Sequence, residues 1–546
     1  MASKFIFITG GVVSSLGKGL TSGSIAMLLE RCGFKVAIQK IDPYINVDPG
    51  TMSPFQHGEV YVTEDGVETD LDLGHYERFS DCVVNRNSNF TSGRVYYNVI
   101  KKERRGDYLG KTVQVVPHIT DEIKHLIRKA ARGADILISE LGGTVGDIEG
   151  LPFLEAIRQL RLEAGEGCAL NIHLTLIPYL RTSNELKTKP TQHSVGKLRE
   201  IGIQPDIIIC RTSVPLTDEV RKKISLFCNV KPEAVVEEQD VSYSIYEVPI
   251  DLHKQNLDGL ILKTLRLRPR KNPEFEDWMC ILDTIRNPMD ECTIALVGKY
   301  VQIVDSYKSI HEALAHGGIA NKVKVNIKYI DSEKVEQEGV GFLQEGIDGI
   351  LIPGGFGARG IEGKIAATKF AREHKIPFFG ICLGMQVATI EFARNVLGFK
   401  GAHSTEFAPD TPYPVIDIIE TQKTVRKKGA TMRLGAYPCK IKEDSISSRA
   451  YKTNEILERH RHRYEFNNRF LEAFERAGMK IVGIYEKENL VEIIELRDHP
   501  WFVGVQFHPE FKSKPLSPHP LFASFIRAAI DYKYRLISQK RQVQVQ

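Results

Sequence analysis

Short apolar runs recur along the chain, and most of them lead into a helical or glycine-rich segment. In the first half such runs occupy residues 4–9, 35–40, 136–140 and 207–211. Runs of this length that are apolar throughout are typical of parallel strands buried on both faces of a sheet. A helical pattern follows the first run, from Leu20 to about Arg31. We therefore predict a doubly wound α/β domain over residues 1–268.

The same order of elements restarts in the second half. Runs at residues 292–298, 324–330 and 349–353 predict three strands, and a fourth predicted strand ends at Gly380. The fold class is therefore α/β, with a second doubly wound parallel-sheet domain over residues 292–537.

Two segments lie outside these domains. Residues 269–291 contain prolines among mixed charges, and they indicate a linker with a short helix around Trp278. Residues 538–546 form a polar tail that we expect to be frayed.

Composition narrows the classes of protein that fit this pattern. The chain has 546 residues, enough for about two to four domains at roughly 100–200 residues each. Its net charge of +4 is small against 73 basic and 69 acidic residues, so charge gives no reason to expect nucleic acid or a membrane as a partner. No apolar run approaches the ~18–20 residues that span a bilayer.

The cysteines point to a reducing compartment. There are nine, scattered along the chain without any C-x-x-C pair. This usage indicates neither a disulfide framework nor a zinc ribbon. The chain also begins a strand at once, with no apolar segment of the secretory kind. We expect a cytoplasmic protein.

A glycine-rich loop from Gly10 to Gly19 follows the first predicted strand. It departs from the strict G-x-x-x-x-G-K-[ST] pattern, because its first glycine comes one position early and Gly19 follows the lysine. Backbone N–H groups, a helix N-terminus and Lys18 are still present, and together they favour phosphate binding. The alternative is an ordinary glycine-rich turn between a strand and a helix.

Acidic residues lie close to this loop in the predicted sheet. Asp70 and Asp72 fall in a stretch that we predict to be non-helical, and Glu140 ends a buried strand. Carboxylates at such positions hold Mg²⁺ in phosphate-loop enzymes. A solvated acidic loop is the alternative for the first pair. The cluster at residues 187–193 suits a polyphosphate, or else is a charged surface loop.

The strand that ends at Gly380 leads directly into Cys382, and Gly384 then opens a helical pattern. This is the sequence of a nucleophile elbow with cysteine in the place of serine. A free thiol with a pKa of ~8.5 needs a base, which His508 can supply, and Glu510 can orient that imidazole.

Backbone N–H groups of Gly355 and Leu383 are candidates for an oxyanion hole. The alternative for a cysteine is an inert core position, which we accept for the other eight.

Several motifs together resemble the CTP synthase family over nearly the whole chain. The second half is similar to class I (triad) glutamine amidotransferase domains, through residues 353–357, 380–386 and 506–510. The first half carries the more specific motifs, at residues 10–19, 40–46, 58–60, 70–74 and 187–192. The resemblance implies a P-loop-type synthetase domain followed by a flavodoxin-like glutaminase domain.

This resemblance implies a ligase that forms a C–N bond with glutamine as amido donor, in pyrimidine nucleotide biosynthesis. ATP phosphorylates O4 of UTP, with Mg²⁺ near Asp72 and Glu140 and with Lys18 and Lys40 stabilising the transferred phosphoryl group. Ammonia released from glutamine by Cys382, His508 and Glu510 then displaces the phosphate, which gives CTP.

The family resemblance also implies regulation and assembly. Ammonia passes internally between the two sites, through a gate region at His57 and Val60. GTP is the implied activator, CTP the feedback inhibitor, and a homotetramer the implied assembly.

The resemblance assigns ligand contacts residue by residue. It implies ATP contacts at Ser15, Leu16, Gly17, Lys18, Gly19, Leu20, Asp72, Gln239, Asp240 and Val241. It implies contacts with UTP or product CTP at Ser14, Asp147, Ile148, Glu149, Lys187, Thr188, Lys189, Pro190, Thr191, Gln192 and Lys223. It implies glutamine contacts at Gly355, Leu383, Gly384, Met385, Gln386, Glu406 and Arg463. A basic residue is expected where this chain has Gln239.

Two other interpretations compete with this one. A different phosphate-loop amidoligase fused to a glutaminase, such as a cobyrinate amide synthase-like enzyme, would share Lys18 and Cys382 but not the cluster at 187–192. A regulatory or filament-forming homologue would bind nucleotide without turnover, and the presence of every candidate catalytic residue argues against it.

Overall fold

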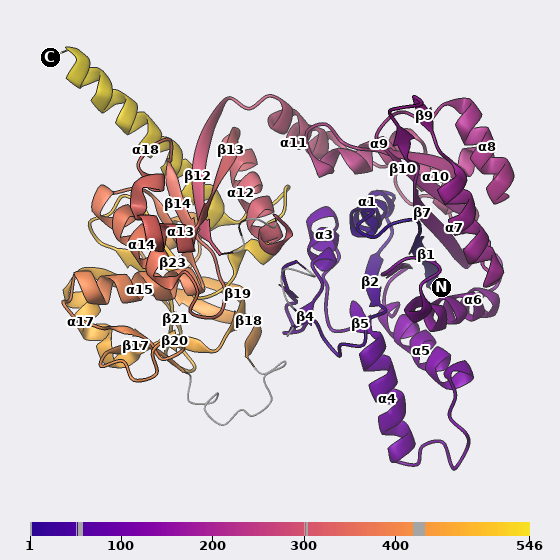
Figure 1. Ribbon diagram of the computed structural model, residues 1–546, viewed down its shortest axis with the longest axis horizontal. Coiled ribbons are helices and arrows are strands. Elements are labelled where there is room, and N and C mark those ends of the chain that lie inside the picture. The colour runs from indigo at the N-terminus through magenta and orange to yellow at the C-terminus, as the bar shows by residue number, and fades with distance from the viewer. Residues whose placement is uncertain are drawn as a thin grey trace. The chain divides into compact units, whose positions relative to one another are not determined.

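The computed structural model describes residues 3–50, 52, 58–299, 301, 304–418 and 432–545. The chain divides into two compact units (Figure 1). The first comprises Met1–Pro49 and Asp72–Leu282, and the second comprises Gly50–Leu71 and Asp283–Gln546.

These boundaries differ from the predicted ones in two places. Residues 50–71 belong with the second unit, where the carboxylates of Glu64 and Glu68 form ion pairs with two arginines of β19 (Glu455–His462). Within the predicted linker, α11 (Glu276–Arg286) confirms the helix around Trp278. The first part of that linker belongs to the first unit, since the Trp278 side chain is buried there and its indole N–H donates to the Tyr246 carbonyl.

The first unit is built on a seven-stranded sheet in which every pairing is parallel. The strand order is β11 (Val235–Gln239), β10 (Ile207–Thr212), β7 (Ala169–Leu176), β1 (Lys4–Gly10), β6 (Ile136–Leu141), β2 (Val36–Asp42) and β5 (Asn89–Thr91). The strands predicted at 4–9, 35–40, 136–140 and 207–211 are thus confirmed. Since β1 lies in the middle of the sheet, the glycine-rich loop opens at its centre.

Helices pack on this sheet and connect its strands. One hydrophobic core joins apolar residues of the sheet to α4, α5 and α6. The helices are α1 (Lys18–Arg31), α3 (Asp72–Phe79), α4 (Ser92–Arg104), α5 (Thr120–Ala130), α6 (Leu151–Ala164), α7 (Lys189–Glu200), α8 (Asp218–Cys228), α9 (Val248–Lys254) and α10 (Leu257–Thr264). A two-stranded ribbon, β8 (Tyr179–Leu180) and β9 (Glu185–Leu186), precedes α7.

The second unit has a nine-stranded sheet whose first part has flavodoxin-like order. The parallel strands are β13 (Val323–Asp331), β12 (Asp290–Gly298), β14 (Gly349–Ile352), β15 (Phe378–Ile381) and β23 (Phe502–Val505). Antiparallel strands extend it: β22 (Leu490–Leu496), β21 (Met479–Tyr485), β18 (Arg433–Ile441) and β19 (Glu455–His462). The predicted α/β class is confirmed, and the antiparallel extension is an addition to it.

Alternating side chains along the strands of this sheet pack into two hydrophobic cores, one on each face. Ala295 and Val297 face one core, with α14 and α15, whereas Ile294 and Leu296 face the other, with α12 and α18. The helices are α12 (Lys308–Asn321), α13 (Ser332–Glu338), α14 (Ile361–His374), α15 (Leu383–Asn395), α16 (Ile446–Tyr451), α17 (Leu471–Arg476) and α18 (Pro520–Val545). Two small sheets complete the unit: β16 (His403–Ser404), β17 (Pro414–Ile418) and β20 (Tyr464–Phe466), and β3 (Tyr61–Val62) with β4 (Glu68–Thr69).

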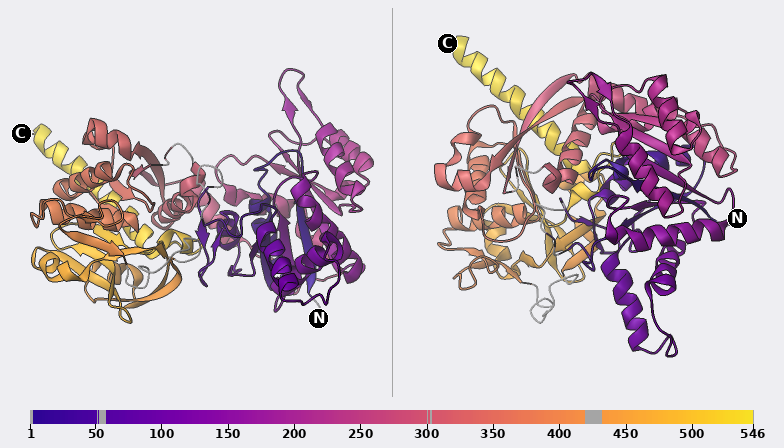
Figure 2. Two further views of the ribbon diagram at one scale, coloured as in Figure 1. Left: turned by 60° about the horizontal axis from the view of Figure 1, so that its bottom comes forward. Right: turned by 45° about the vertical axis from the view of Figure 1, so that its right-hand side comes forward.

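The predicted frayed tail at 538–546 is wrong for the residues that are described. Helix α18 continues to Val545, and its far end extends away from the rest of the second unit in every view (Figures 1 and 2). The reason is local, since this stretch has no glycine or proline, and four of its nine residues are glutamine, which favours helix.

Candidate active sites

Cys382 stands on a sharp turn between β15 and α15. Its backbone has φ 53° and ψ −101°, a conformation that costs a non-glycine residue free energy and that typically marks a functional position. The Cys382 N–H donates to the Val505 carbonyl at 2.7 Å, which ties the turn to the neighbouring strand.

The glycines that flank Cys382 are required by close packing. A Cβ at Gly380 would lie 2.7 Å from the backbone of Gly384, and a Cβ at Gly384 would lie 2.2 Å from the Ile352 carbonyl oxygen. Strand, turn and helix thus approach too closely for any side chain on either side of the cysteine.

His508 and Glu510 come together just after β23. His508 Nδ1 lies 2.7 Å from Glu510 Oε1, and both side chains are buried. Burial disfavours the imidazolium, but the charges of Glu510 and Cys382 more than offset it and raise the pKa of His508 to about 10. Among the residues that the structure describes, His508 Nε2 has no hydrogen-bond partner, so this nitrogen is available to the thiol or to a substrate.

A cavity of about 260 Å³ opens onto these side chains. Gly354 lies between them, because a Cβ there would be 2.8 Å from His508 Cε1 and 3.7 Å from Cys382 Cβ. Gly355 also lines the cavity and adjoins Leu383, the first residue of α15. The cavity walls thus bring together the cysteine, the imidazole and Gly355, and the second candidate oxyanion-hole residue, Leu383, lies directly behind Gly355.

The remaining predicted glutamine contacts lie around this cavity but do not line it. Gln386 donates to the Tyr464 carbonyl at 3.0 Å, and Glu406 accepts from the Gly357 N–H at 3.0 Å. Glu406 and Arg463 both act electrostatically on the Tyr464 hydroxyl, whose pKa is raised chiefly by burial. Gly384 and Met385 are buried in α15.

Part of the cavity wall comes from a segment that sequence reasoning assigned to the other domain. Met52, Glu59 and Val60 line it together with Phe356 and Arg461. Val60 is therefore at the cavity, as the gate prediction requires, whereas His57 lies outside the described residues. Glu59 accepts hydrogen bonds from the N–H and the hydroxyl of Ser309.

The glycine-rich loop of the first unit holds Lys18 at the start of α1. Lys18 is almost fully buried, and its ammonium donates to the Gly143 carbonyl at 2.7 Å. Burial lowers the pKa of Lys18, and so does the charge of Lys40. The Lys18 side chain passes close over Gly10, since a Cβ there would lie 2.8 Å from Lys18 Nζ and would displace the ammonium.

A second lysine joins the two candidate metal carboxylates. The Lys40 ammonium contacts Asp72, and it lies 2.8 Å from Glu140 Oε1. The other oxygen of Glu140 accepts from the hydroxyls of Ser22 at 3.0 Å and Tyr76 at 2.6 Å. The expectation of a non-helical stretch here is wrong, because Asp72 begins helix α3, where a carboxylate is favoured by the helix dipole.

Gly19 departs from the phosphate-loop pattern for a reason that only the structure provides. A Cβ at this position would lie 2.2 Å from Asp72 Oδ1. The place that the Ser or Thr of a strict P-loop would occupy is thus taken by the Asp72 carboxylate.

Asp72 and Glu140 fit the needs of Mg²⁺ when substrate phosphates complete its shell, because Mg²⁺ is commonly held by one or two carboxylates. No group of three or more acidic, His or Cys ligands occurs among the described residues.

Comparison with known proteins identifies the family. Residues 4–267 match the model described as CTP synthase N-terminus, and residues 302–528 match glutamine amidotransferase class-I. A CTP synthase of Aquifex aeolicus is 61% identical over 97% of this chain and 99% of its own length. CTP synthases of Geobacter metallireducens and Caldanaerobacter subterraneus are 59% and 58% identical, over 98% and 97% of this chain and 99% of their own lengths. The chain belongs to the CTP synthase family.

Membership of the CTP synthase family excludes the cobyrinate amide synthase-like alternative. It also places a synthetase domain and a glutamine amidotransferase domain in one chain. Within the described residues, no helix is both long and apolar enough to pass through a bilayer.

The nucleotide contacts expected for a CTP synthase lie just before α6, around the start of α7 and on α8. Thr188 and Thr191 are buried, and Lys187 pairs with Glu185 at 2.5 Å. Lys223 on α8 also acts electrostatically on Glu185. The Asp147 carboxylate accepts from the Thr144 N–H, while Ile148 and Glu149 are exposed after it.

A basic residue that sequence reasoning missed, Arg211, lies beside the ATP contacts expected at 239–241. Gln239 ends β11 and is exposed, and the Asp240 carboxylate accepts from Arg211 at 3.1 Å. A Cβ at Gly17 would lie 3.5 Å from Arg211 Nη1, so a guanidinium does lie beside the phosphate loop. It comes from β10, and no linear pattern around Gln239 could have revealed it.

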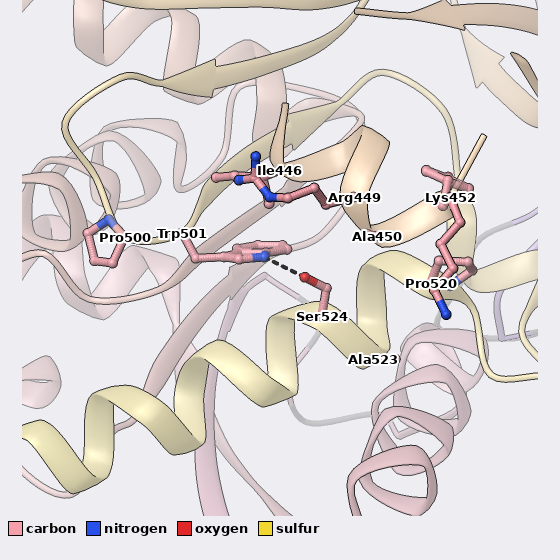
Figure 3. Close-up of a pocket in the computed structure, with 10 residues that line it drawn as sticks. Ile446, Arg449, Ala450, Lys452, Pro500, Trp501, Pro520, Ala523 and Ser524 are labelled. Carbon is pink, nitrogen blue, oxygen red and sulfur yellow. Dashed lines mark hydrogen bonds between the residues drawn. The ribbon is translucent and has the colours of Figure 1, made fainter. Parts of the chain in front are cut away.

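A larger cavity of the CTP synthase chain, about 590 Å³, lies elsewhere in the second unit (Figure 3). Its walls come from α16, α18 and the loop before β23, and the indole N–H of Trp501 donates to Ser524 there. None of the described residues that line it is Cys, His, Asp or Glu. This cavity therefore lacks the groups needed for amide hydrolysis.

The described cysteines other than Cys382 are free thiols. Cys280 is exposed, which differs from the expectation of core positions, and Cys168 is half-buried.

Proposed function

We propose that this chain makes CTP from UTP, ATP and L-glutamine, in two reactions at two sites. The observation that carries the proposal is the presence of both constellations in one member of the family: Cys382 with His508 and Glu510, and Lys18 and Lys40 with two carboxylates.

In the glutaminase reaction the Cys382 thiolate attacks the side-chain amide carbon of glutamine and forms a C–S bond. The N–H groups of Gly355 and Leu383 stabilise the oxyanion, and protonated His508 gives its proton to the departing ammonia. Water, deprotonated by His508, then cleaves the thioester to give glutamate and the free thiol. The raised pKa of His508 supports this, because an imidazolium beside the sulfur favours the thiolate.

In the synthetase reaction Lys18 and Lys40 stabilise the negative charge of the phosphoryl group that passes from ATP to O4 of UTP. Phosphate is a good leaving group, so ammonia can displace it at C4. We propose that Asp72 and Glu140 hold Mg²⁺, which neutralises phosphate charge when bound. The shared contact of both carboxylates with the Lys40 ammonium supports a cation at this place.

The finer assignments follow from the family and belong to the same proposal. Residues 15–20, Asp72 and 239–241 bind ATP, and Ser14, 147–149, 187–192 and Lys223 bind UTP or CTP. Glutamine is held at Gly355, 383–386, Glu406 and Arg463, and ammonia passes a gate at His57 and Val60. GTP activates, CTP inhibits, and the protein acts as a homotetramer in the cytoplasm.

The test is an assay of CTP formation from ATP, Mg²⁺ and UTP, with glutamine or ammonium as nitrogen source. Cys382→Ala is expected to abolish the glutamine-dependent reaction and to spare the ammonium-dependent one. Lys18→Ala is expected to abolish both. Loss of both reactions in a folded Cys382→Ala variant would refute this division of labour, and a wild-type protein that binds nucleotide without turnover would be the regulatory homologue instead.

A further inference from the structure

Residues 58–71, here called the strap, precede Asp72 in the chain but fold onto the second unit. The strap contains the antiparallel pair β3 and β4, and it supplies Glu59 and Val60 to the cavity wall at Cys382. Several of its other contacts are with residues that touch His508 or its backbone.

The first line of contact runs through aromatic rings. Tyr61 is 1% exposed, its hydroxyl donates to the Phe511 carbonyl at 2.9 Å, and its ring packs edge-on against Phe511 at 5.0 Å between centroids. The Phe511 ring in turn stacks on the His508 imidazole at 5.3 Å, with the planes 17° apart. Tyr61 therefore fixes the ring that covers one face of the imidazole.

The second line of contact runs through Arg459, which is 3% exposed. Its guanidinium donates to the Tyr61 hydroxyl at 2.9 Å, to the Val62 carbonyl at 3.1 Å and to Glu64 at 3.0 Å. The carbonyl of the same residue accepts the His508 N–H at 2.8 Å. One residue thus joins the strap to the backbone of His508.

Arg461 joins the strap to Cys382 in the same way, with its side chain on the strap and its carbonyl beside the sulfur. Its guanidinium donates to Glu68 at 2.8 Å and lies over the Phe356 ring, while its carbonyl lies 4.0 Å from the Cys382 sulfur. Because side chains alternate along a strand, β19 presents both arginines to the strap and turns His460 and His462 into the core. Burial keeps these two imidazoles neutral, so Cys382 and Glu510 are the charged groups that act on His508.

We propose that the strap is part of the glutaminase site, and that Tyr61 and Arg459 are positioning residues that hold His508 in line with Cys382. This rests on the proposed amide hydrolysis. It follows that residues 292–537 by themselves form an incomplete glutaminase, since the part that fixes the base comes from the N-terminal half of the chain.

The test uses the full chain with Tyr61→Phe, Arg459→Met and the conservative Arg459→Lys. Tyr534→Phe is the matched control, because it also removes a hydrogen-bonded tyrosine hydroxyl of the second unit, one that lies on α18 and donates to Asp290 of β12. The readouts are kcat and KM for glutamine hydrolysis, the ammonium-dependent rate, and the pH dependence of Cys382 alkylation by iodoacetamide.

Tyr61→Phe is expected to lower kcat for glutamine about tenfold, because it removes both buried hydrogen bonds of this hydroxyl, with KM little changed. Arg459→Met is expected to lower it roughly a hundredfold, and Arg459→Lys to restore part of that loss. In the weakened variants Cys382 is expected to react more slowly with iodoacetamide at neutral pH, because a misplaced imidazole takes the thiol proton less readily. The ammonium-dependent rate and the Tyr534→Phe control stay at wild-type values.

Wild-type kcat and an unchanged alkylation profile in both Tyr61→Phe and Arg459→Met would overturn the proposal. An equal loss of the ammonium-dependent rate in Tyr61→Phe would also overturn it, because the effect would then be general. Failure of the proposed function looks different: the wild-type protein itself would not hydrolyse glutamine, whatever the strap variants do to the alkylation profile.

Discussion

Adding one methyl group at Gly19 is expected to disable CTP formation. Position 19 follows Lys18, where strict phosphate loops carry Ser or Thr, so sequence comparison alone would suggest that a side chain is tolerated. In the structure a Cβ at Gly19 would lie 2.2 Å from Asp72 Oδ1 and 2.7 Å from Asp72 Cγ. Gly19→Ala therefore displaces the carboxylate that we assign to Mg²⁺.

The size of the effect follows from the overlap. Ordinary contacts of a Cβ begin at 3.4 Å, so the Asp72 carboxylate must move by about 1 Å. Asp72 has a short side chain that is held by Lys40, so it cannot move that far and keep this contact. A misplacement of ~1 Å at a reacting centre costs on the order of 10²-fold in rate. The overpacking is expected to lower the free energy of unfolding by about 1–3 kcal/mol. The better helix propensity of alanine offsets about 0.5–1 kcal/mol of that loss.

The assay is ammonium-dependent CTP formation with ATP, Mg²⁺ and UTP, alongside equilibrium unfolding. Gly196→Ala on α7 is the matched control, since a Cβ there meets no described atom within 4 Å. The control is expected to keep its rate and to gain about 0.5–1 kcal/mol of stability. A Gly19→Ala rate within about twofold of wild type would refute the reasoning, because that loss is far below the ~10²-fold that such a displacement costs.

Two further predictions concern charge. Lys40→Met takes away the ammonium that both candidate metal carboxylates contact. It is expected to lower the free energy of unfolding, measured with denaturant, by about 3–5 kcal/mol, and Mg²⁺ is expected to restore part of that loss. A variant that is equally stable with and without Mg²⁺ would contradict this. Glu510→Gln is expected to lower the pKa of His508 from about 10, because burial then acts without the opposing carboxylate. The stability that the wild type gains from this raised pKa is fully present below pH ~6.5 and is lost as pH rises toward about 10. In equilibrium unfolding, the free energy of unfolding of the variant should therefore decline less over that range than that of the wild type. Glu472→Gln, at an exposed carboxylate, should show the same decline as the wild type.

Much of the fold could be predicted because its signals are local. Buried parallel strands are short and apolar throughout, and each expected strand was found within a few residues of its predicted bounds. The sharp turn at Cys382 could also be predicted, since it depends on glycines only two residues away on either side.

Other features depended on partners that are distant in sequence. Asp72 was expected on an irregular stretch, but it begins a helix and takes the space above Gly19. The basic group beside the phosphate loop is Arg211 from another strand rather than a residue at position 239.

The amino-acid sequence by itself determined the α/β class, the phosphate loop and the Cys-His-Glu residues, because each is a short pattern whose chemistry is carried by neighbouring residues. Only the tertiary structure decided that the strap belongs with the glutaminase. The physical reason is that its half-buried ion pair, from Glu64 to Arg459, joins residues 395 positions apart, and no local sequence pattern can indicate a contact of that range.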